Sequence, residues 1–331
     1  MTIEPAPARV DPLGLAFGRG RPAEVLRRLD LAVNRRLDGI LQGDYRGLVP
    51  GHGSELGETR RYQAGDDVRR IDWNVTARTT EPHVRETVAD RELETWVLLD
   101  RSPSLDFGTA DYEKRELAVV ALAATGFLTA RTGNRFGAVF TGRTPQPEIV
   151  PARSGRVALL ALLHQALAAP EPTPGRARRR PDRTAPVGPT ALGPAIERLA
   201  AVHRRAGLAV VVSDFLAADD WQRPLARLAA RHETLAVEIV DPRELTLPSV
   251  GVLTLVDPET GRRRDVQTSS AGLRERYAEA ARAQRAAIAA AIRRSGADHL
   301  VLRTDRDWLI DLVRFVTLRR ARTASLPRRA R

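Results

Sequence analysis

Three oxygen-bearing side chains at alternate positions follow a strongly apolar segment of the sequence. Asp100, Ser102 and Ser104 come directly after the apolar run at residues 95–99, which predicts a buried strand. Alternate residues of an extended chain point to the same side, so this carboxylate and these two hydroxyls are expected to lie together where the strand ends. Oxygen ligands of this kind suit a hard cation such as Mg²⁺. The D-x-S-x-S group therefore predicts a magnesium site.

Further oxygen ligands stand at the borders of other predicted elements. Asp214 and Asp241 each follow an apolar run, and Thr190 precedes a helix-like segment, where it is either a helix N-cap or a hydroxyl ligand. Ligands of an open α/β sheet bind outside the carboxyl ends of the strands. Asp214 is therefore expected beside Asp100, whereas Asp241 need not converge with them. The alternative is that these Ser and Asp residues only cap helices.

The elements that would position these ligands alternate regularly from Glu94 onward. Strand-like runs occupy residues 96–100, 135–140, 208–213, 234–240 and 299–304, and helix-like segments occupy 111–130, 155–168, 190–205, 221–231, 273–294 and 307–320. Three of the strand-like runs are almost continuously apolar, which is typical of parallel strands covered on both faces. This order predicts an α/β fold with a doubly wound, mostly parallel sheet flanked by helices.

Composition divides the chain into four regions. We expect a flexible N-terminus at residues 1–21, an N-terminal helix and a Gly/Arg/Asp-rich lid region at 22–90, the α/β domain at 91–322 and a basic tail at 323–331. Within the α/β domain, residues 170–189 hold six prolines and are predicted to be a disordered insertion. Residues 250–268 are predicted to form a β-hairpin around an Asp-Pro-Glu-Thr-Gly turn.

The predicted ligands resemble the metal-ion-dependent adhesion site of von Willebrand factor A-type domains. The resemblance implies that Ser102, Ser104 and Thr190 bind Mg²⁺ directly or through water, with Asp100 and Asp214 as the carboxylates around them. It also implies an open coordination position for a carboxylate of a partner protein. Mn²⁺ or an empty site is the alternative to Mg²⁺. Two positions depart from the pattern, because Leu105 replaces a common methionine and Phe215 follows Asp214 where glycine is usual.

A wider resemblance covers about residues 22–322. The segments Gly51-His52-Gly53-Ser54-Glu55, residues 61–73, residues 76–78, Asp241-Pro242-Arg243-Glu244, the 250–268 hairpin and Thr304-Asp305 are similar to those of domain-of-unknown-function family 58. Members of this family carry a von Willebrand A-like domain and are commonly encoded beside MoxR-type AAA+ ATPases. The resemblance therefore implies a MoxR-type AAA+ ATPase, or its client, as the partner.

The block at residues 51–78 has two interpretations. Its glycines permit close backbone approach, and its interleaved Asp and Arg residues can pair with one another. The structural interpretation is a lid fixed to the sheet by ion pairs and by Tyr62 and Trp73. The functional interpretation is a recognition surface near the metal site. The structural interpretation is favoured, because paired charges satisfy one another.

Composition limits the classes of function. The 331 residues include no cysteine, which excludes thiolate chemistry and disulfides and fits the cytoplasm. No apolar run approaches the roughly 20 residues that cross a bilayer. The net charge is +12, and 52 of the 53 basic residues are arginine, the exception being Lys114. The arginine clusters are not interleaved with aromatic residues, so we expect no specific nucleic-acid binding.

We therefore expect a non-enzymatic adaptor that binds protein through a magnesium-dependent adhesion-type site. One alternative is a hydrolytic enzyme built on Asp66, Asp67 or Asp72 with His52 or His83, although no recognised catalytic motif accompanies them. The other is weak nucleic-acid binding through the arginine-rich loops.

Overall fold

The computed structural model describes most of the chain from residue 94 onward and short stretches before it. The described residues are 27, 59–63, 71–79, 81–85, 94–130, 134–142, 146–167, 191–216, 219–257 and 262–325. The predicted flexible terminus, the proline-rich insertion at 170–189 and Thr190 lie outside them, as does the predicted N-terminal helix except for Arg27, which is helical. The proposed division into regions remains a prediction.

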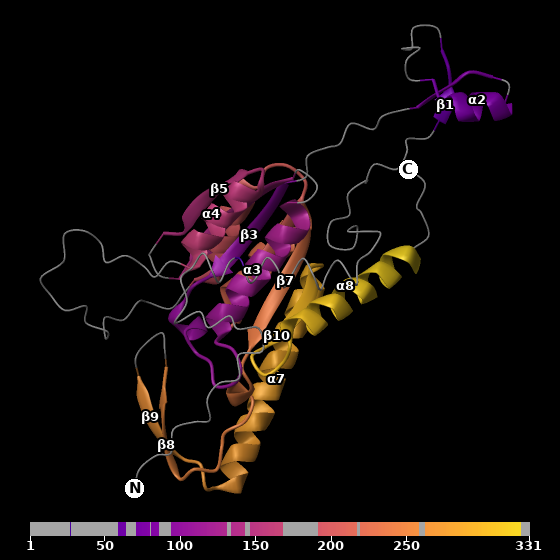
Figure 1. Ribbon diagram of the computed structural model, residues 1–331. Coiled ribbons are helices and arrows are strands. Elements are labelled where there is room, and N and C mark those ends of the chain that lie inside the picture. The colour runs from indigo at the N-terminus through magenta and orange to yellow at the C-terminus, as the bar shows by residue number, and fades with distance from the viewer. Residues whose placement is uncertain are drawn as a thin grey trace, which may run out of the picture.

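A six-stranded sheet forms the centre of the molecule (Figure 1). Its strands are β3 (Glu94–Asp100), β4 (Arg135–Thr141), β5 (Glu148–Arg153), β6 (Leu208–Ser213), β7 (Glu233–Val240) and β10 (Asp298–Arg303). They lie in the order β10-β7-β6-β3-β4-β5, and every neighbouring pair is parallel except β4 with β5. The five strands predicted from the sequence are all present, so the predicted mostly parallel sheet is confirmed.

Helices cover both faces of this sheet. The first face packs against α3 (Lys114–Ala130), α4 (Arg156–Leu167) and α8 (Trp308–Ser325), and the second against α5 (Leu192–Val202), α6 (Gln222–Ala229) and α7 (Ala271–Ser295). On β3, Val97 and Leu99 belong to the first core, whereas Trp96 and Leu98 belong to the second. This alternation explains why residues 96–99 of the strand are all apolar, since both of its faces are buried.

Strand β5 was not predicted. Its sequence, Glu-Ile-Val-Pro-Ala-Arg, is short and contains Pro151. It pairs antiparallel with β4 and has no neighbour on its other side within the described sheet. Proline is tolerated on such an edge, where one row of backbone groups needs no partner strand.

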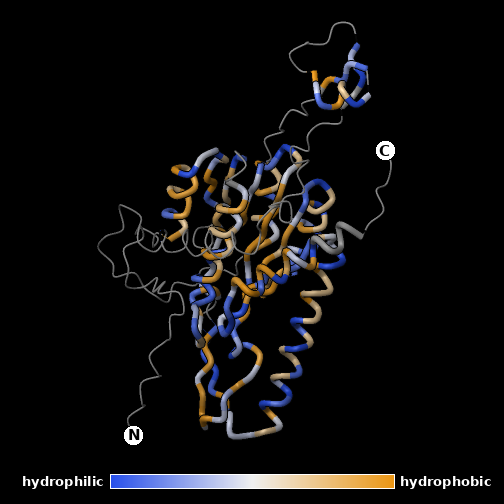
Figure 2. The backbone as a smooth tube through the Cα atoms, turned by 45° about the vertical axis from the view of Figure 1, so that its right-hand side comes forward, coloured by the Kyte–Doolittle hydropathy of each residue, from blue (hydrophilic) through white to orange (hydrophobic). Residues whose placement is uncertain are grey.

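An arm extends beyond the carboxyl edge of the sheet (Figure 1). It consists of the predicted hairpin, formed by β8 (Val252–Val256) and β9 (Arg263–Gln267), and the first half of α7. The buried residues of this 25-residue helix, Ile288, Ala291 and Ile292, all lie in its last third. Figure 2 shows hydrophobic residues concentrated in the sheet, whereas hydrophilic and hydrophobic residues alternate along α7.

A small unit precedes the sheet in sequence. Strands β1 (Thr59–Arg61) and β2 (His83–Arg85) pair antiparallel, and α2 (Trp73–Thr79) lies between them in sequence. Arg61 forms an ion pair of 2.8 Å with Glu81, which lies outside the 51–78 block. Trp73, however, is 70% exposed, which does not fit its predicted role as an anchor to the sheet. The placement of this unit as a lid remains a prediction.

None of the helices among the described residues combines the length and the apolar composition needed to cross a membrane.

Candidate functional site

The predicted carboxylates lie on two adjacent strands at one edge of the sheet. Asp100 is the last residue of β3, and Asp214 directly follows β6. These two strands are parallel neighbours, with Leu99 opposite Val212. Both carboxylates are almost fully buried, at 3% and 2% exposure. The carboxyl ends of parallel strands therefore bring together two acidic residues that are far apart in the sequence.

Asp100 is held by two hydrogen bonds. Its Oδ1 accepts the backbone N–H of Ser102 at 2.9 Å, and its Oδ2 accepts the hydroxyl of Ser213 at 2.7 Å. Burial and then the negative charge of Asp214 raise the pKa of Asp100 to about 6, although the hydrogen bonds from Ser213 and Ser102 act in the opposite direction. Two buried carboxylates thus repel each other at this edge.

The two predicted hydroxyl ligands face one another. Ser102 precedes the short 3-10 helix η3 (Pro103–Leu105), which contains Ser104, and their Oγ atoms lie 2.9 Å apart. Gly142, which directly follows β4, approaches this loop closely, because a Cβ there would lie 2.3 Å from the backbone nitrogen of Ser102. Leu105, which stands where methionine is common in the resembling sites, is fully buried in the core. The hydroxyls are therefore presented from a fixed loop.

Asp214 is paired with the only lysine of the chain. Lys114 Nζ lies 2.7 Å from Asp214 Oδ2 and 2.5 Å from Glu244 Oε1, and the lysine side chain is fully buried. Burial alone would raise the pKa of Asp214, but the charge of Lys114 and its hydrogen bond outweigh burial and lower this pKa. Asp214 Oδ1 accepts the N–H of Leu216, and the nearby Ser104 hydroxyl also lowers the pKa of this carboxylate.

The ion pairs continue from Lys114 toward α7. Glu244 ends the 3-10 helix η5 (Pro242–Glu244), and its Oε2 accepts from Arg285 of α7 at 2.7 Å. Arg285 also donates to Glu238 of β7 at 2.8 Å, and Glu238 in turn lies 2.8 Å from His299 Nε2. Each buried carboxylate of this network has a basic partner.

Asp241 has a further set of hydrogen bonds, and its backbone N–H also donates to Glu244. Its carboxylate accepts the backbone N–H and the hydroxyl of Thr109, the hydroxyl of Thr304 and the N–H of Arg243. It therefore ties the loop after β3 to the ends of β7 and β10. The strand-end position predicted for Asp241 is correct, and its hydrogen bonds account for its burial without a ligand.

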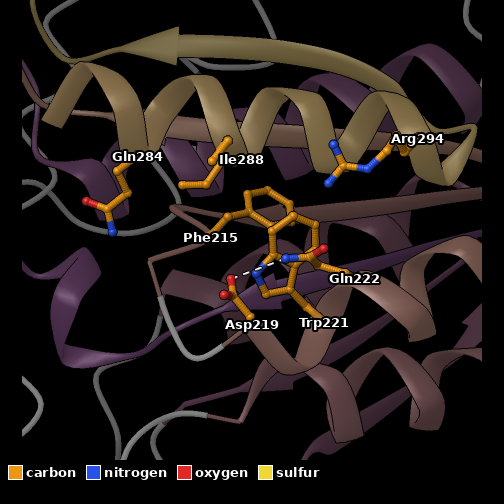
Figure 3. A pocket seen from close by; sticks show the side chains of 8 residues that line it. Phe215, Asp219, Trp221, Gln222, Gln284, Ile288 and Arg294 are labelled. Atoms are coloured by element: carbon orange, nitrogen blue, oxygen red, sulfur yellow. Dashed lines mark hydrogen bonds between the residues drawn. The ribbon is translucent and has the colours of Figure 1, made fainter. Parts of the chain in front are cut away.

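A pocket of about 290 Å³ is lined by Phe215, the residue that follows Asp214 (Figure 3). Phe215 and Trp221 form one wall, their rings meeting edge to face at 5.0 Å, and α7 forms the other wall with Gln284 and Ile288. Phe215 has a φ of 55°, the left-handed conformation that favours glycine. The departure from glycine noted in the sequence thus places a large ring against Trp221.

Most of the chain matches the sequence model of one protein family. Residues 58–287 match the family model described as Protein of unknown function DUF58. The chain belongs to the DUF58 family. The uncharacterized protein Rv1480 of Mycobacterium tuberculosis is 50% identical over 324 residues, which cover 97% of this chain and 98% of that protein. The uncharacterized protein MAV169 of Mycobacterium avium is 48% identical over 172 residues, covering 52% of this chain and 94% of that protein.

Solved structures with a related arrangement have low sequence identity to this DUF58 chain. BatB from Bacteroides thetaiotaomicron is 13% identical with a TM-score of 0.39, covering 69% of this chain and 99% of that chain. The SpRpn10 VWA domain is 16% identical with a TM-score of 0.35, covering 67% and 93%. The family assignment therefore rests on the sequence match, and the fold on the sheet described above.

Four of the five predicted metal ligands of this DUF58 protein come together. Asp100, Ser102 and Asp214 are buried and form one cluster with the half-buried Ser104, and Thr190 lies outside the described residues. Over the part of the chain that the structure describes, no group of three or more histidine and acidic side chains has the arrangement of a metal site. The cluster differs from such groups because hydroxyls supply half of its side chains.

The oxygens of this cluster suit a magnesium ion. Mg²⁺ binds octahedrally with ligand distances of about 2.1 Å, which places adjacent ligand oxygens roughly 3 Å apart. The hydroxyls of Ser102 and Ser104 have this separation, at 2.9 Å. The repulsion between Asp100 and Asp214 is a further property that a cation would relieve. These oxygens are of the type that Mg²⁺ binds, although the 2.9 Å contact is also a hydrogen bond, and the ion itself stays a prediction.

Lys114, Glu244 and Arg285 were missed as members of this site. One signal was available for Lys114, which is the single lysine in a chain of arginines and stands at the first position of α3. A cation is unfavourable at a helix N-terminus, so a lysine there indicates a specific acidic partner.

The described residues of the alternative hydrolytic site have local structural roles. Asp72 Oδ1 accepts the N–H groups of Asn74 and Val75 at the start of α2. His83 Nδ1 lies 2.8 Å from the carbonyl oxygen of Glu81 and 3.0 Å from the hydroxyl of Thr79. His52, Asp66 and Asp67 lie outside the described residues.

Proposed function

We propose that this DUF58 protein is a non-enzymatic adaptor that binds a partner protein through a magnesium-dependent adhesion-type site. The observation that carries the proposal is the cluster of Asp100, Ser102, Ser104 and Asp214 at the carboxyl edge of the sheet. This edge is where open α/β sheets bind their ligands.

Each residue has a proposed part in holding the ion. Ser102 and Ser104 supply neutral oxygen ligands. The resemblance to metal-ion-dependent adhesion sites adds the hydroxyl of Thr190 as a third. Asp100 orients the loop through the N–H of Ser102 and supplies negative charge, as does Asp214. When bound, Mg²⁺ would supply an electrophilic centre with a strong preference for a further oxygen anion.

The partner is proposed to present a carboxylate to this edge of the sheet. Members of the family are commonly encoded beside MoxR-type AAA+ ATPases. This association suggests such an ATPase or its client as the partner, and thus a role in protein maturation or complex assembly. The absence of cysteine from the whole sequence supports the cytoplasm as the compartment. Exposed valines of the arm, Val252 at 66% and Val256 at 54%, offer apolar contact area beyond the same edge.

A pull-down with a MoxR-type AAA+ ATPase tests the proposal. We expect wild-type protein to retain the ATPase in Mg²⁺ and to release it in a chelator. Asp100→Ala should abolish retention, because it removes a carboxylate and the loop's hydrogen bond at once. Asp106→Ala is the matched control, since it removes an exposed carboxylate from the same loop.

Two results would contradict the proposal in different ways. Retention that is equal in Mg²⁺, in chelator and in Asp100→Ala would exclude the metal bridge while leaving an adaptor role. Turnover of a nucleotide, ester or peptide substrate by the purified protein, abolished by Asp100→Ala, would replace the adaptor with an enzyme.

A further inference from the structure

Lys114 introduces a fixed positive charge beside the proposed metal site. Its ammonium group contacts Asp214 at 2.7 Å and Glu244 at 2.5 Å, and its side chain is fully buried. Burial lowers the pKa of a lysine, but the charges of Asp214 and Glu244 reverse this effect and raise the pKa of Lys114. The two ion pairs thus place the ammonium group between two carboxylates.

This cation offsets the charge of one of the two carboxylates in the site. Asp214 Oδ2 is taken by Lys114, and Glu244 is shared between Lys114 and Arg285. Asp100 has only the uncharged donors Ser102 and Ser213 on its oxygens, and no basic side chain of the described residues bonds to it. A divalent ion would thus find a single uncompensated carboxylate together with neutral hydroxyls.

The residue type suits this position. An ammonium is a compact point charge with three donors, whereas a guanidinium is a wide planar fork. Lys114 fits between two carboxylates on different loops, one after β6 and one after β7, with no exposed surface. The chain uses arginine at 52 of its 53 basic positions and lysine only here, in agreement with a steric demand for the smaller group.

We propose that Lys114 keeps the divalent-ion affinity of this site low, so that the ion is retained only when a partner's carboxylate supplies the missing negative charge. The inference rests on the proposed function and adds its regulation. Because coupling between two ligands is reciprocal, the ion and the partner carboxylate each strengthen the binding of the other. The free protein then holds little metal, and metal-dependent binding is confined to the complex.

Titration with Mn²⁺ alone tests the first half of this inference. Lys114→Met keeps much of the side-chain volume and removes the charge, and it should bind Mn²⁺ roughly tenfold tighter or more than wild type, since a nearby unit charge has at least this effect at moderate dielectric. The double variant Lys114→Met/Asp214→Asn is the matched control. It removes the freed carboxylate as well, and the gain in affinity should disappear.

A second variant covers the case in which Lys114→Met does not fold, since it leaves two buried carboxylates without their cation. Lys114→Met/Glu244→Gln removes one carboxylate together with the cation. We expect Mn²⁺ to raise the melting temperature of this variant more than that of wild type, because the ion replaces the lost charge beside Asp214.

Acetate in excess, as a probe carboxylate, tests the second half. It should tighten Mn²⁺ binding by wild type more than by the Lys114 variants. Equal Mn²⁺ affinity and an equal acetate effect in wild type and in the folded variants would overturn the role of Lys114 while leaving the metal site in place. Absence of Mn²⁺ binding from wild type and from all variants, with and without acetate, would overturn both this inference and the metal bridge.

Discussion

Phe215 shows how a single residue next to the site balances strain against burial. Its φ of 55° places a β-carbon where L-residues are disfavoured, at a cost of roughly 1–2 kcal/mol. Its ring is 2% exposed and packs edge to face on Trp221. Burial of a phenylalanine ring contributes about 2 kcal/mol or more, which offsets the strain. The chain therefore tolerates a backbone conformation for which glycine is the usual residue.

At Phe215, a glycine variant should be more stable than an alanine variant, which is the reverse of the usual order of stability. Phe215→Ala keeps the strain and loses the ring, so we expect it to lower the free energy of unfolding by roughly 3 kcal/mol or more. Phe215→Gly loses the ring and relieves the strain, so it should be more stable than the alanine variant by about 1 kcal/mol. Urea denaturation of both variants measures the difference.

The control for this comparison is Leu225, a buried residue of α6. There, glycine should be less stable than alanine by about 1 kcal/mol, because the backbone is helical. If Phe215→Ala is also more stable to urea than Phe215→Gly, the left-handed conformation stores no strain and the explanation is wrong.

The residues of the site differed in how far the sequence could predict them. Asp100 and Asp214 each follow an apolar run, and strand ends in a parallel sheet share one edge, so their proximity followed from local pattern and fold class. The partners of Lys114 are 100 and 130 residues away from it in the sequence. Spacing carries no information about such pairs, because they depend on how three separate loops pack.

At the scale of elements, two histidines join α5 and β7 at the amino edge of the sheet, opposite the proposed site. His203 follows α5 and His232 precedes β7, and their rings stack with centroids 4.0 Å apart. His203 Nε2 lies 3.2 Å from the carbonyl oxygen of Glu94, and neither nitrogen of His232 has a hydrogen-bond partner among the described residues. Burial, and then the neighbouring His232, lowers the pKa of His203 to about 4. Burial and then Arg231 lower the pKa of His232 as well.

These shifts predict that acid weakens the contact between α5 and β7. The folded state keeps His203 neutral, whereas the unfolded chain takes up a proton below its usual pKa of 6.5. Stability from this residue is therefore complete above that value and is lost as the pH falls toward 4, by about 2 kcal/mol between about pH 7 and about pH 5. Urea denaturation at both pH values measures the loss in wild type.

His203→Asn removes the titrating ring, so the pH-dependent loss should shrink by this amount. His164→Gln, at an exposed position of α4, is the control and should leave the wild-type loss unchanged. An equal loss in wild type and His203→Asn would mean that other groups cause the acid sensitivity.

The elements themselves were largely predictable, and the exceptions have physical causes. Strands buried on both faces and helices with one apolar side carry strong patterns, so β3, β6, β7 and the covering helices were found close to their observed limits. Strand β5 is an edge strand whose residues are mostly half-buried or exposed, so its pattern is weak. The short elements β1, α2 and β2 bury little, and their sequence therefore carries no clear periodicity.

At the scale of the whole molecule, the α/β region is complete within residues 94–325. All six strands of the sheet and the six helices that cover it lie in this range. The basic C-terminal segment begins inside this region. Its residue Arg319 pairs with Glu233 of β7 and lies 2.8 Å from Asp298 of β10. The side chain of Arg319 is only 10% exposed, so this arginine is part of the packed α/β region.

A fragment of residues 91–325 should therefore fold on its own. We expect it to unfold cooperatively, with a melting temperature within about 5 °C of the full chain, because both cores are intact. The fragment 91–295 lacks β10 and α8 and serves as the control. It exposes the edge of β7 and loses Trp308, a fully buried core residue, so it should show no cooperative transition.

Thermal denaturation followed by circular dichroism compares the three chains. A fragment 91–325 that melts without cooperativity would show that residues before 91 are part of the fold, and the predicted boundary between the lid region and the α/β domain would then be wrong.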